Sequence, residues 1–337
     1  MTEVSAGIIL NRAGEILACK RGEGRRNAHL WEFPGGKREA GEDAKACLHR
    51  ELLEELSLPV WNVREVRTAE EGGIRFTFLT AETDAAPVPT EHEAVTFLRP
   101  RALLPLPFCP ADAPVARALA LNDPPVRHLF WDFDGTLFDT YPMMTAAFSL
   151  ACARLGAWVT QAQALRRMKV SLGDAIRLTA DAYGLSRRSL AEAYRRETEQ
   201  TSPGEWPLLP GITEALRTLS GMGCRHYLVT HRDRSALEAL EAKGLLPLFT
   251  GWVTAEDGFP RKPDPASLRS LLERFGVEPA AACMIGDRPL DAQAGRAAGI
   301  LGCLLDPEAF FPDCACDLKA CAAAELPALL CPEPILI

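Results

Sequence analysis

Two groups of acidic residues, each in a fixed spacing with glycine, stand far apart on this chain. In the first, Gly36 is followed after five residues by Glu42 and after seven more by the run Arg50-Glu51-Leu52-Leu53-Glu54-Glu55. The second is the run Asp132-Phe133-Asp134-Gly135-Thr136. A chain of 337 residues is long enough for roughly two ordinary domains. The two groups therefore predict two domains, each with a site of its own.

The composition is that of a globular protein and limits the classes of partner. Hydrophobic residues make up 47% and charged residues 24% of the chain. The net charge of −8 disfavours a nucleic-acid partner, because such binders carry a basic excess. No apolar run is long enough to span a bilayer, and Met1 to Leu10 lack the pattern of a secretory signal. We therefore expect a cytoplasmic protein without a membrane partner; the sequence gives no signature of its oligomeric state.

The eleven cysteines are scattered, and in the cytosol we expect them to be reduced. Cys314, Cys316 and Cys321, with Cys331 further on, lie closer together. Their spacing contains no CxxC pair, so packing as small apolar residues is favoured over a structural metal site.

Apolar periodicity in the first part of the chain predicts strands and helices of ordinary length. Strands are expected at residues 4–10, 15–20, 63–69 and 74–79, with a turn at 11–14, and helices at 43–56 and 115–121. The run Asn122-Asp123-Pro124-Pro125 that follows is typical of a turn or loop. We place a linker at residues 122–126, between domains at 1–121 and 127–337.

The second part repeats a strand followed by a helix, which predicts a parallel sheet with crossover helices. Strands are expected at residues 128–133, 226–229, 251–254, 282–285 and 300–305. Four of them lead into polar residues, namely Asp132, Thr230, Glu256 and Asp287. Ligands of open α/β sheets bind beyond the carboxyl ends of strands, so these groups could converge on one site. The mostly helical residues at about 141–205 interrupt this order and are expected to form an inserted cap.

Within the first acidic group, Glu51, Glu54 and Glu55 share one face of the expected helix, because their spacing is i, i+3, i+4. Carboxylates so close together repel one another, and a divalent metal bound by oxygens would relieve the repulsion. Gly35-Gly36 would let the backbone approach a ligand or metal closely. An exposed acidic helix is the alternative for such a string alone.

Together with Gly36, Glu42 and Arg50, these glutamates resemble the Nudix box, and the resemblance extends over residues 1–121. The run Leu30-Trp31-Glu32-Phe33-Pro34-Gly35-Gly36-Lys37 is similar to the MutT branch. The resemblance implies an α/β/α sandwich with a mixed sheet. It also implies hydrolysis of nucleoside triphosphates to monophosphate and pyrophosphate with Mg²⁺, or with Mn²⁺ in its place. The implied metal ligands are the Gly35 carbonyl, Glu51, Glu54, Glu55 and, from another loop, Glu91. Glu51 would also activate the attacking water, and Arg50 would orient a glutamate.

Two positions differ from the family pattern. Ser57 stands where the box has a glycine that ends the helix in the left-handed conformation, which should cost about 1 kcal/mol at most. Asp112 stands where 8-oxo-dGTP hydrolases carry an Asn. An ionised Asp only accepts hydrogen bonds, which would suit a base with an exocyclic amine such as cytosine. Phe33 is expected either to line the base pocket or to be plain core.

The second acidic group follows an apolar strand. A carboxylate such as Asp132 at a strand's end can attack phosphorus, and a neighbour such as Asp134 can protonate the leaving oxygen and then activate water. Three further segments follow in order: Val229-Thr230-His231, Arg261-Lys262-Pro263-Asp264-Pro265 and Ile285-Gly286-Asp287-Arg288-Pro289-Leu290-Asp291.

Over residues 127–332, these four segments resemble the motifs of haloacid-dehalogenase-superfamily phosphatases, in the phosphoglycolate-phosphatase-like branch. The resemblance implies a Rossmann-like parallel sheet with an inserted helical cap. Asp132 would form an aspartyl-phosphate, and Asp134 would be the general acid/base. Thr230 and Lys262 would hold the phosphoryl group. The implied Mg²⁺ ligands are Asp132, Asp134 by its carbonyl, Asp287 and, in support, Asp291. Substrate contacts are expected from Gly135, Thr136 and His231. The basic residues Arg166, Arg167, Lys169 and Arg177 of the cap are candidate contacts, or a solvated helix face.

We therefore expect a bifunctional hydrolase that depends on Mg²⁺, or on Mn²⁺ in its place, in both domains, and whose partners are small nucleotides and phosphorylated molecules. One domain would cleave a nucleoside triphosphate, and the other would hydrolyse a phosphomonoester. Three alternatives stay open: a first domain that only senses nucleotides and regulates its neighbour, a phosphatase for an unrelated metabolite, and a phosphatase for pyrophosphate.

Overall fold

The computed structural model describes residues 1–336, which divide into two compact units. The first unit comprises Met1–Pro125 together with the segment that begins at Cys331, and the second comprises Val126–Leu330. Each unit has its own sheet and its own hydrophobic core. The two-domain α/β fold expected from the sequence is therefore observed. Of the helices in the described residues, none combines the length and apolarity needed to cross a membrane.

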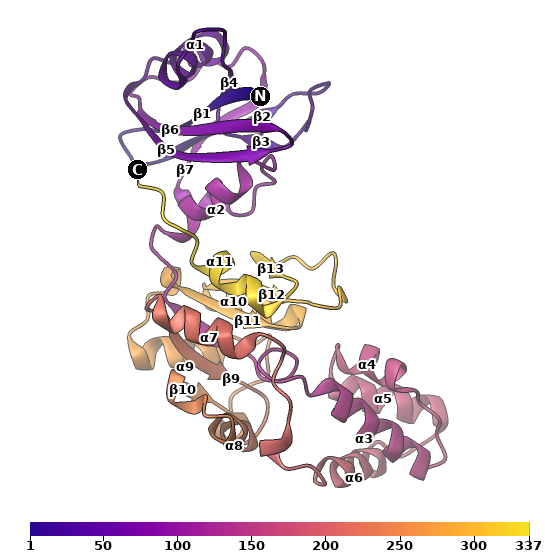
Figure 1. Cartoon of the computed structure of the whole chain (residues 1–337). Coiled ribbons are helices and arrows are strands. Elements are labelled where there is room, and N and C mark those ends of the chain that lie inside the picture. The colour runs from indigo at the N-terminus through magenta and orange to yellow at the C-terminus, as the bar shows by residue number, and fades with distance from the viewer. Residues whose placement is uncertain (337) are drawn as a thin grey trace. The chain divides into compact units, whose positions relative to one another are not determined.

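A seven-stranded mixed sheet forms the centre of the first unit (Figure 1). Its strands are β1 (Thr2–Leu10), β2 (Ile16–Arg21), β3 (Trp31–Glu32), β4 (Gly35–Lys37), β5 (Trp61–Glu71), β6 (Ile74–Glu82) and β7 (His92–Leu98). The main order is β3-β2-β1-β6-β5, with β4 also paired to β1 and β7 to β2. β1 and β6 run parallel, and the other pairs are antiparallel.

Two helices, α1 (Ala44–Leu56) and α2 (Ala113–Leu121), cover opposite faces of this sheet (Figure 1). Successive side chains of a strand point to opposite faces. Ile9 therefore packs in the cluster with the leucines of α1, whereas its neighbour Ile8 packs in the cluster with the apolar face of α2. This arrangement is the expected α/β/α sandwich.

Both ends of α1 are defined by local hydrogen bonds. The Asp43 carboxylate accepts the Ala46 N–H at 2.8 Å and caps the first turn. Ser57 ends the helix in the left-handed region, with φ 49° and ψ 37°, and its N–H donates to the Leu53 carbonyl at 3.2 Å. The sequence argument that serine occupies a glycine-type position is confirmed. The helix thereby holds its glutamates in one fixed register.

The second unit contains a six-stranded parallel sheet. Its strands are β8 (His128–Trp131), β9 (Arg225–Val229), β10 (Phe249–Val253), β11 (Ala282–Gly286), β12 (Leu301–Leu305) and β13 (Leu318–Ala320), in the order β10-β9-β8-β11-β12-β13. Its helices are α7 (Ile212–Gly221), α8 (Ser235–Ala242), α9 (Ala266–Phe275), α10 (Pro289–Ala298) and α11 (Leu326–Leu330). The chain moves outward from β8 to β10 and then returns to the other side of β8. The carboxyl ends of β8, β9 and β11 thus open onto one crevice.

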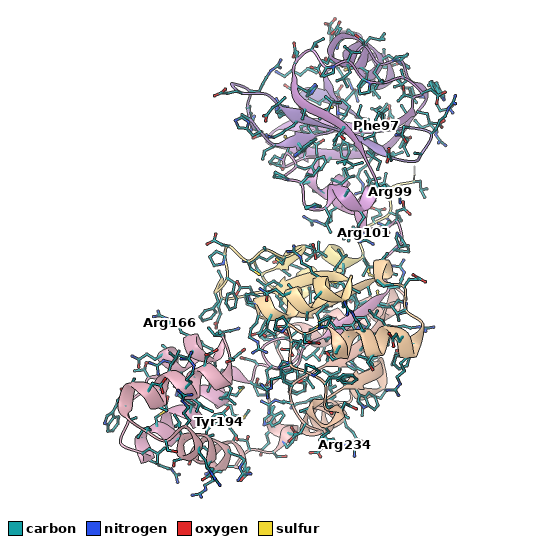
Figure 2. All side chains as sticks on the ribbon, turned by 180° about the vertical axis from the view of Figure 1, so that it is seen from behind. Phe97, Arg99, Arg101, Arg166, Tyr194 and Arg234 are labelled. Carbon is teal, nitrogen blue, oxygen red and sulfur yellow. The ribbon has the colours of Figure 1, made fainter. Side chains whose placement is uncertain are left out.

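Four helices form the cap inserted after β8 (Figure 1). They are α3 (Tyr141–Arg154), α4 (Gln161–Met168), α5 (Leu172–Tyr183) and α6 (Arg187–Thr198). The cap has a core of its own, in which Phe148 and Tyr194 meet edge to face (Tyr194 is labelled in Figure 2). Hydroxyl side chains at Thr160, Ser171 and Ser186 cap the starts of α4, α5 and α6.

The C-terminal segment departs from the expected division at residues 127–337, because from Cys331 onward the chain belongs to the first unit. Ile335 packs in the core cluster beneath α2. The Asn122 amide donates to the Pro332 carbonyl at 3.2 Å, and Arg67 donates to the Glu333 carbonyl at 3.1 Å. A short apolar tail has no periodicity that reveals its partner, so only the packing assigns it.

We predict that Ile335→Ala destabilises the first unit by about 2–4 kcal/mol, because it leaves a cavity in a closed core. Leu336, with 84% of its surface exposed, provides the matched control, and Leu336→Ala should have no effect. Differential scanning calorimetry measures both. Equal unfolding curves for the two variants would contradict the assignment of the tail.

Candidate functional sites

Arg50 organises the acidic residues of the first site. Its guanidinium donates to both oxygens of Glu42 at 3.0 Å, to Glu51 at 2.9 Å and to Glu54 at 3.1 Å. A further donation reaches the Lys37 carbonyl at 3.1 Å. These hydrogen bonds lower the pKa of Glu42 to about 2. The expected role of Arg50, to orient glutamates, is compatible with this arrangement.

Gly35 and Gly36 lie on β4 beside β1, where a larger residue does not fit. A Cβ at Gly35, whose φ is 150°, would stand 2.0 Å from the Ser5 carbonyl oxygen. A Cβ at Gly36 would stand 2.2 Å from the carboxyl carbon of Glu51. The glycine pair therefore lets the Glu51 carboxylate pack directly against the backbone.

Glu55 is largely buried, with 19% of its side chain exposed, whereas 60% of the Glu54 side chain is exposed. Burial, together with the charges of Glu51, Glu91 and Glu32, raises the pKa of Glu55 to about 7, although the nearby His92 opposes this shift. His92 Nε2 lies 3.8 Å from a Glu55 oxygen. Glu55 is thus surrounded by other carboxylates with little positive charge nearby. A divalent cation held by oxygen ligands would balance this negative charge.

Glu91, the expected distant ligand, lines the same cavity as Glu51 and Glu55, and its carboxylate accepts a hydrogen bond from Arg25. The cavity has a volume of about 590 Å³. It also contains Phe33 and Asp112, so the residues proposed to recognise the base share one space with Gly35, Glu51, Glu55 and Glu91. Glu54 is not among the residues that line it, and 60% of its side chain is exposed.

Asp112 is 5% exposed, and its Oδ1 accepts the Phe33 N–H at 3.2 Å. Burial raises the pKa of Asp112 to about 7, and Glu32 adds to the effect. At this pKa the carboxyl is partly protonated near neutral pH and can then also donate, whereas the sequence argument treats Asp112 as ionised. The buried ring of Phe33 lies 5.3 Å from the ring of Phe108, centre to centre, and is tilted by 35° against it, so Phe33 belongs to the core as well as to the cavity wall.

Asp132 follows the central strand β8 of the second unit and is 2% exposed. Lys262 Nζ donates to its Oδ1 at 2.6 Å and lies 2.7 Å from Asp291 Oδ1. Burial opposes ionisation of Asp132, but Lys262 and Arg288 outweigh it and lower the pKa. Asp132 is therefore an ionised, buried carboxylate, as a nucleophile requires.

Asp287 follows β11 and is completely buried. Its Oδ2 accepts from Lys169 Nζ at 2.8 Å, yet burial still raises its pKa. Asp287 Oδ1 and Asp132 Oδ2 are buried without a hydrogen-bond partner. Of the residues that the structure describes, only Asp132, Asp287 and Asp291 form a group of candidate ligands with atoms within 4.8 Å of one another. The oxygens without a hydrogen bond and the negative charge of the three aspartates fit a divalent cation.

The second and third motifs meet through His231, whose Nε2 accepts the Lys262 backbone N–H at 2.8 Å. Burial, with Lys262 nearby, lowers the pKa of His231 to about 3, so the ring is neutral and accepts. Thr230 is 3% exposed at the end of β9. His231, expected to bind substrate, thus positions the Lys262 loop in this structure.

Gly135 and Thr136 complete the loop after β8. A Cβ at Gly135, whose φ is 76°, would stand 2.6 Å from Asp287 Oδ2, so only glycine fits there. The Thr136 hydroxyl is buried without a hydrogen-bond partner.

Comparison with known proteins assigns a family to each domain. Residues 126–299 match the family model of haloacid dehalogenase-like hydrolases, and residues 1–119 match that of the NUDIX domain. The chain belongs to the haloacid dehalogenase-like hydrolases. It also carries a NUDIX domain at its N-terminal end.

Two curated relatives and one solved structure resemble the hydrolase domain. A phosphoglycolate phosphatase of Nitrosospira multiformis is 33% identical over 52% of this chain and 81% of its own. One of Pseudomonas putida is 31% identical over 52% and 67%. The crystal structure of a predicted phosphoglycolate phosphatase from Haemophilus somnus, at 18% identity, covers 60% of this chain and 96% of its own with a TM-score of 0.53. That structure supports the fold of the hydrolase domain alone.

Three basic residues of the hydrolase domain have larger parts in the site than the sequence suggested. Arg288 directly follows Asp287 and lies 3.8 Å from Asp132 Oδ2. Arg232 hydrogen-bonds Asp134. Lys169, one of four candidates in the cap, reaches Asp287. In the sequence, Arg288 directly follows Asp287 and Arg232 directly follows His231, and this adjacency to the motifs could have indicated their roles.

The other three candidate substrate contacts in the cap have partners within the cap or lie at the surface. Arg167 donates to Thr179 at 2.6 Å and Arg177 to Asp174 at 2.7 Å, while Arg166 is exposed at the surface (Figure 2). Of the clustered cysteines, Cys321 is exposed, and Cys314, Cys316 and Cys331 are partly buried.

We predict that the NUDIX domain loses stability between pH 5 and pH 8 through Asp112. Its pKa of about 7 in the folded state lies above the ordinary value of 3.8, so the folded domain binds this proton more tightly than the unfolded chain does. The stabilisation is complete below about pH 4 and is lost as the pH rises towards 7. Asp112→Asn should abolish this loss, which is on the order of 2 kcal/mol.

Calorimetry at pH 5 and pH 8 measures this loss of stability. The unfolding transition of the NUDIX domain is identified as the one that Ile335→Ala shifts. A parallel decline in wild type and Asp112→Asn would show that Asp112 is ionised throughout.

Proposed function

We propose that the chain is a bifunctional hydrolase. Its NUDIX domain cleaves a nucleoside triphosphate to monophosphate and pyrophosphate, and its hydrolase domain cleaves a phosphomonoester through an aspartyl-phosphate. The observation that carries the phosphatase proposal is the buried Asp132, with one oxygen on Lys262 and the other without a hydrogen-bond partner. We place both reactions in the cytoplasm, where scattered cysteines stay reduced.

In the phosphatase reaction, an oxygen of Asp132 attacks phosphorus while the bond to the leaving oxygen breaks. Asp134 gives a proton to that oxygen and later takes one from the water that hydrolyses the aspartyl-phosphate. Thr230 and Lys262 bind the phosphoryl oxygens. A divalent cation held by Asp132, Asp287 and the Asp134 carbonyl, with Asp291 in support, would stabilise the negative charge of the phosphoryl group.

In the NUDIX reaction, Glu51 takes a proton from the attacking water, and Arg50 keeps Glu51 in register. Gly35, Glu54, Glu55 and Glu91 would complete the ligand set for cations, which would screen the charge of the phosphate chain. Asp112 recognises the base from the wall of the cavity. None of the glutamates expected for catalysis is missing, which favours a catalytic NUDIX domain over one that only senses nucleotides.

The relatives favour phosphoglycolate as the substrate of the phosphatase domain. A second candidate is the nucleoside monophosphate that the NUDIX domain releases. A cavity of about 460 Å³, lined by Gly135, Tyr141 and Lys169, lies beside the aspartates and is within the size range of sites for drug-sized ligands. A nucleoside belongs to that size class. The tether would raise the concentration of one site's product at the other.

For the NUDIX domain, we predict that Glu54→Gln and Glu55→Gln each raise the barrier by several kcal/mol, because a charge of the cation site is lost. Release of pyrophosphate from a panel of nucleoside triphosphates measures this, with the exposed Glu65→Gln as the control. Activity within a fewfold of wild type in both variants would refute NUDIX catalysis. Wild-type binding without turnover would establish the sensor.

Base recognition by Asp112 has a pH signature. Above about pH 7 the carboxylate only accepts, so preference for bases with an exocyclic amine should increase from pH 6 to pH 8. In Asp112→Asn, the ratios of kcat/KM among bases should not vary with pH. Unchanged ratios in the wild type as well would remove Asp112 from base recognition.

For the phosphatase domain, we predict that Asp132→Asn abolishes hydrolysis of phosphomonoesters, because an amide is a poor nucleophile toward phosphorus, and leaves pyrophosphate release intact. Product analysis with a nucleoside triphosphate then separates the candidates. Nucleoside among the wild-type products indicates a monophosphate substrate, and two phosphates with monophosphate left over indicate pyrophosphate. If the triphosphate yields only monophosphate and pyrophosphate while the enzyme hydrolyses phosphoglycolate, the two domains catalyse separate reactions. Loss of both activities in folded Asp132→Asn would contradict independent sites.

A further inference from the structure

Arg232, two residues beyond Thr230, holds the carboxylate of Asp134. Its Nε donates to Asp134 Oδ1 at 2.9 Å and to Oδ2 at 3.0 Å, and its Nη2 donates to Oδ1 at 2.7 Å. The Thr140 hydroxyl donates to the same Oδ1 at 2.6 Å. Oδ1 therefore accepts three hydrogen bonds, whereas Oδ2 shares one and retains a lone pair.

Aromatic rings restrict the guanidinium of Arg232. Its central carbon lies 4.3 Å from the ring centre of Trp206 and 5.6 Å from that of Phe133, and the two rings meet edge to face. Phe133 stands between the two motif aspartates, and Trp206 lies on the segment that returns from the cap. Stacking of this kind fixes the plane in which the guanidinium donates.

The backbone of Arg232 is fixed as well. Its N–H donates to Thr230 Oγ1 at 3.1 Å, and its carbonyl accepts the Ala255 N–H at 2.7 Å. The side chain is thus anchored at the end of β9 and directed at Asp134 from the neighbouring strand. With 21% of its side chain exposed, Arg232 is largely shielded from water, which strengthens these hydrogen bonds.

We propose that Arg232 is the positioning residue for the proton transfers of Asp134, and that Oδ2 is the oxygen that carries the proton. The proposal rests on the proposed phosphatase reaction. In the first half, Asp132 attacks phosphorus, the bond to the leaving oxygen breaks, and protonated Asp134 gives its proton to that oxygen. In the second half, water attacks phosphorus, the Asp132–phosphorus linkage breaks, and Asp134 takes the proton of the water. Both transfers need the same carboxylate at the same place.

Pre-steady-state kinetics with p-nitrophenyl phosphate test the proposal on the full chain with Mg²⁺. The p-nitrophenolate ion leaves without a proton, so the first turnover does not need Asp134, whereas hydrolysis of the aspartyl-phosphate does. In Arg232→Met, we expect a burst of about one p-nitrophenolate per site at the wild-type rate, followed by a steady state slowed at least about tenfold, within the usual span of general acid–base effects. With an alkyl phosphate such as glycerol phosphate, whose leaving oxygen needs the proton, we expect slow turnover and no burst.

Three further variants complete the test. Asp134→Asn should reproduce the pattern of Arg232→Met, and the double variant should lose no more than the more impaired single one, since both act on one proton transfer. Arg232→Lys retains a cation that can donate and should recover part of the steady-state rate. The control is Arg234→Met, because Arg234 lies at the surface with 74% of its side chain exposed (Figure 2). It should match the wild type.

Equal slowing of the first turnover and the steady state in Arg232→Met, unchanged rates in both, or additive losses in the double variant would overturn the proposal. If Arg232→Met fails to fold, Arg232→Lys and Arg232→Gln are judged by the same burst criterion. A wild type inactive on both esters refutes the phosphatase reaction and the proposal together. An active wild type with uniform losses in the variants refutes the role of Arg232 alone.

Discussion

The buried ammonium group of Lys262 is the interaction on which the second site depends. It lies between Asp132 and Asp291, at 2.6 and 2.7 Å, and its side chain is fully buried. An isolated ion in a protein interior costs several kcal/mol, and close pairing with good geometry is needed to offset that cost. Lys262 allows Asp132 to be ionised out of water, which a nucleophile at phosphorus requires. His231 in turn fixes the loop that carries Lys262.

The first site meets the same constraint on an unrelated fold. Arg50 donates to Glu42, Glu51 and Glu54 and so gathers three carboxylates around one guanidinium. Glu55 lies beyond the reach of these donations, and burial raises its pKa. In both domains, permanent cations balance part of the negative charge, and the remaining carboxylate oxygens are available for a divalent metal.

The longer elements of the fold could be predicted because their patterns are local. The continuous apolar runs that are buried in β1, β2 and β6 are visible directly in the sequence, and the leucines of α1 follow the period of a helix. Strands β3, β4 and β13 were not predicted, since two or three residues carry no period. Strand β7 was also missed, and the C-terminal tail was assigned to the wrong domain. Each finds its place only through partners far away in the sequence.

The sequence by itself determined which side chains stand at the ends of β8, β9 and β11 and along α1, because short motifs fix residue type and spacing locally. It also determined both families and the class of hydrolase. Only the tertiary structure decided the state and the partners of these groups. The pKa of Asp112 is raised to about 7 because the fold buries it, with Glu32 adding to the effect. Arg232 meets Asp134 across 98 residues, and Lys169 meets Asp287 across 118. Charge and hydrogen bonding depend on distance in space, which spacing along the chain does not specify.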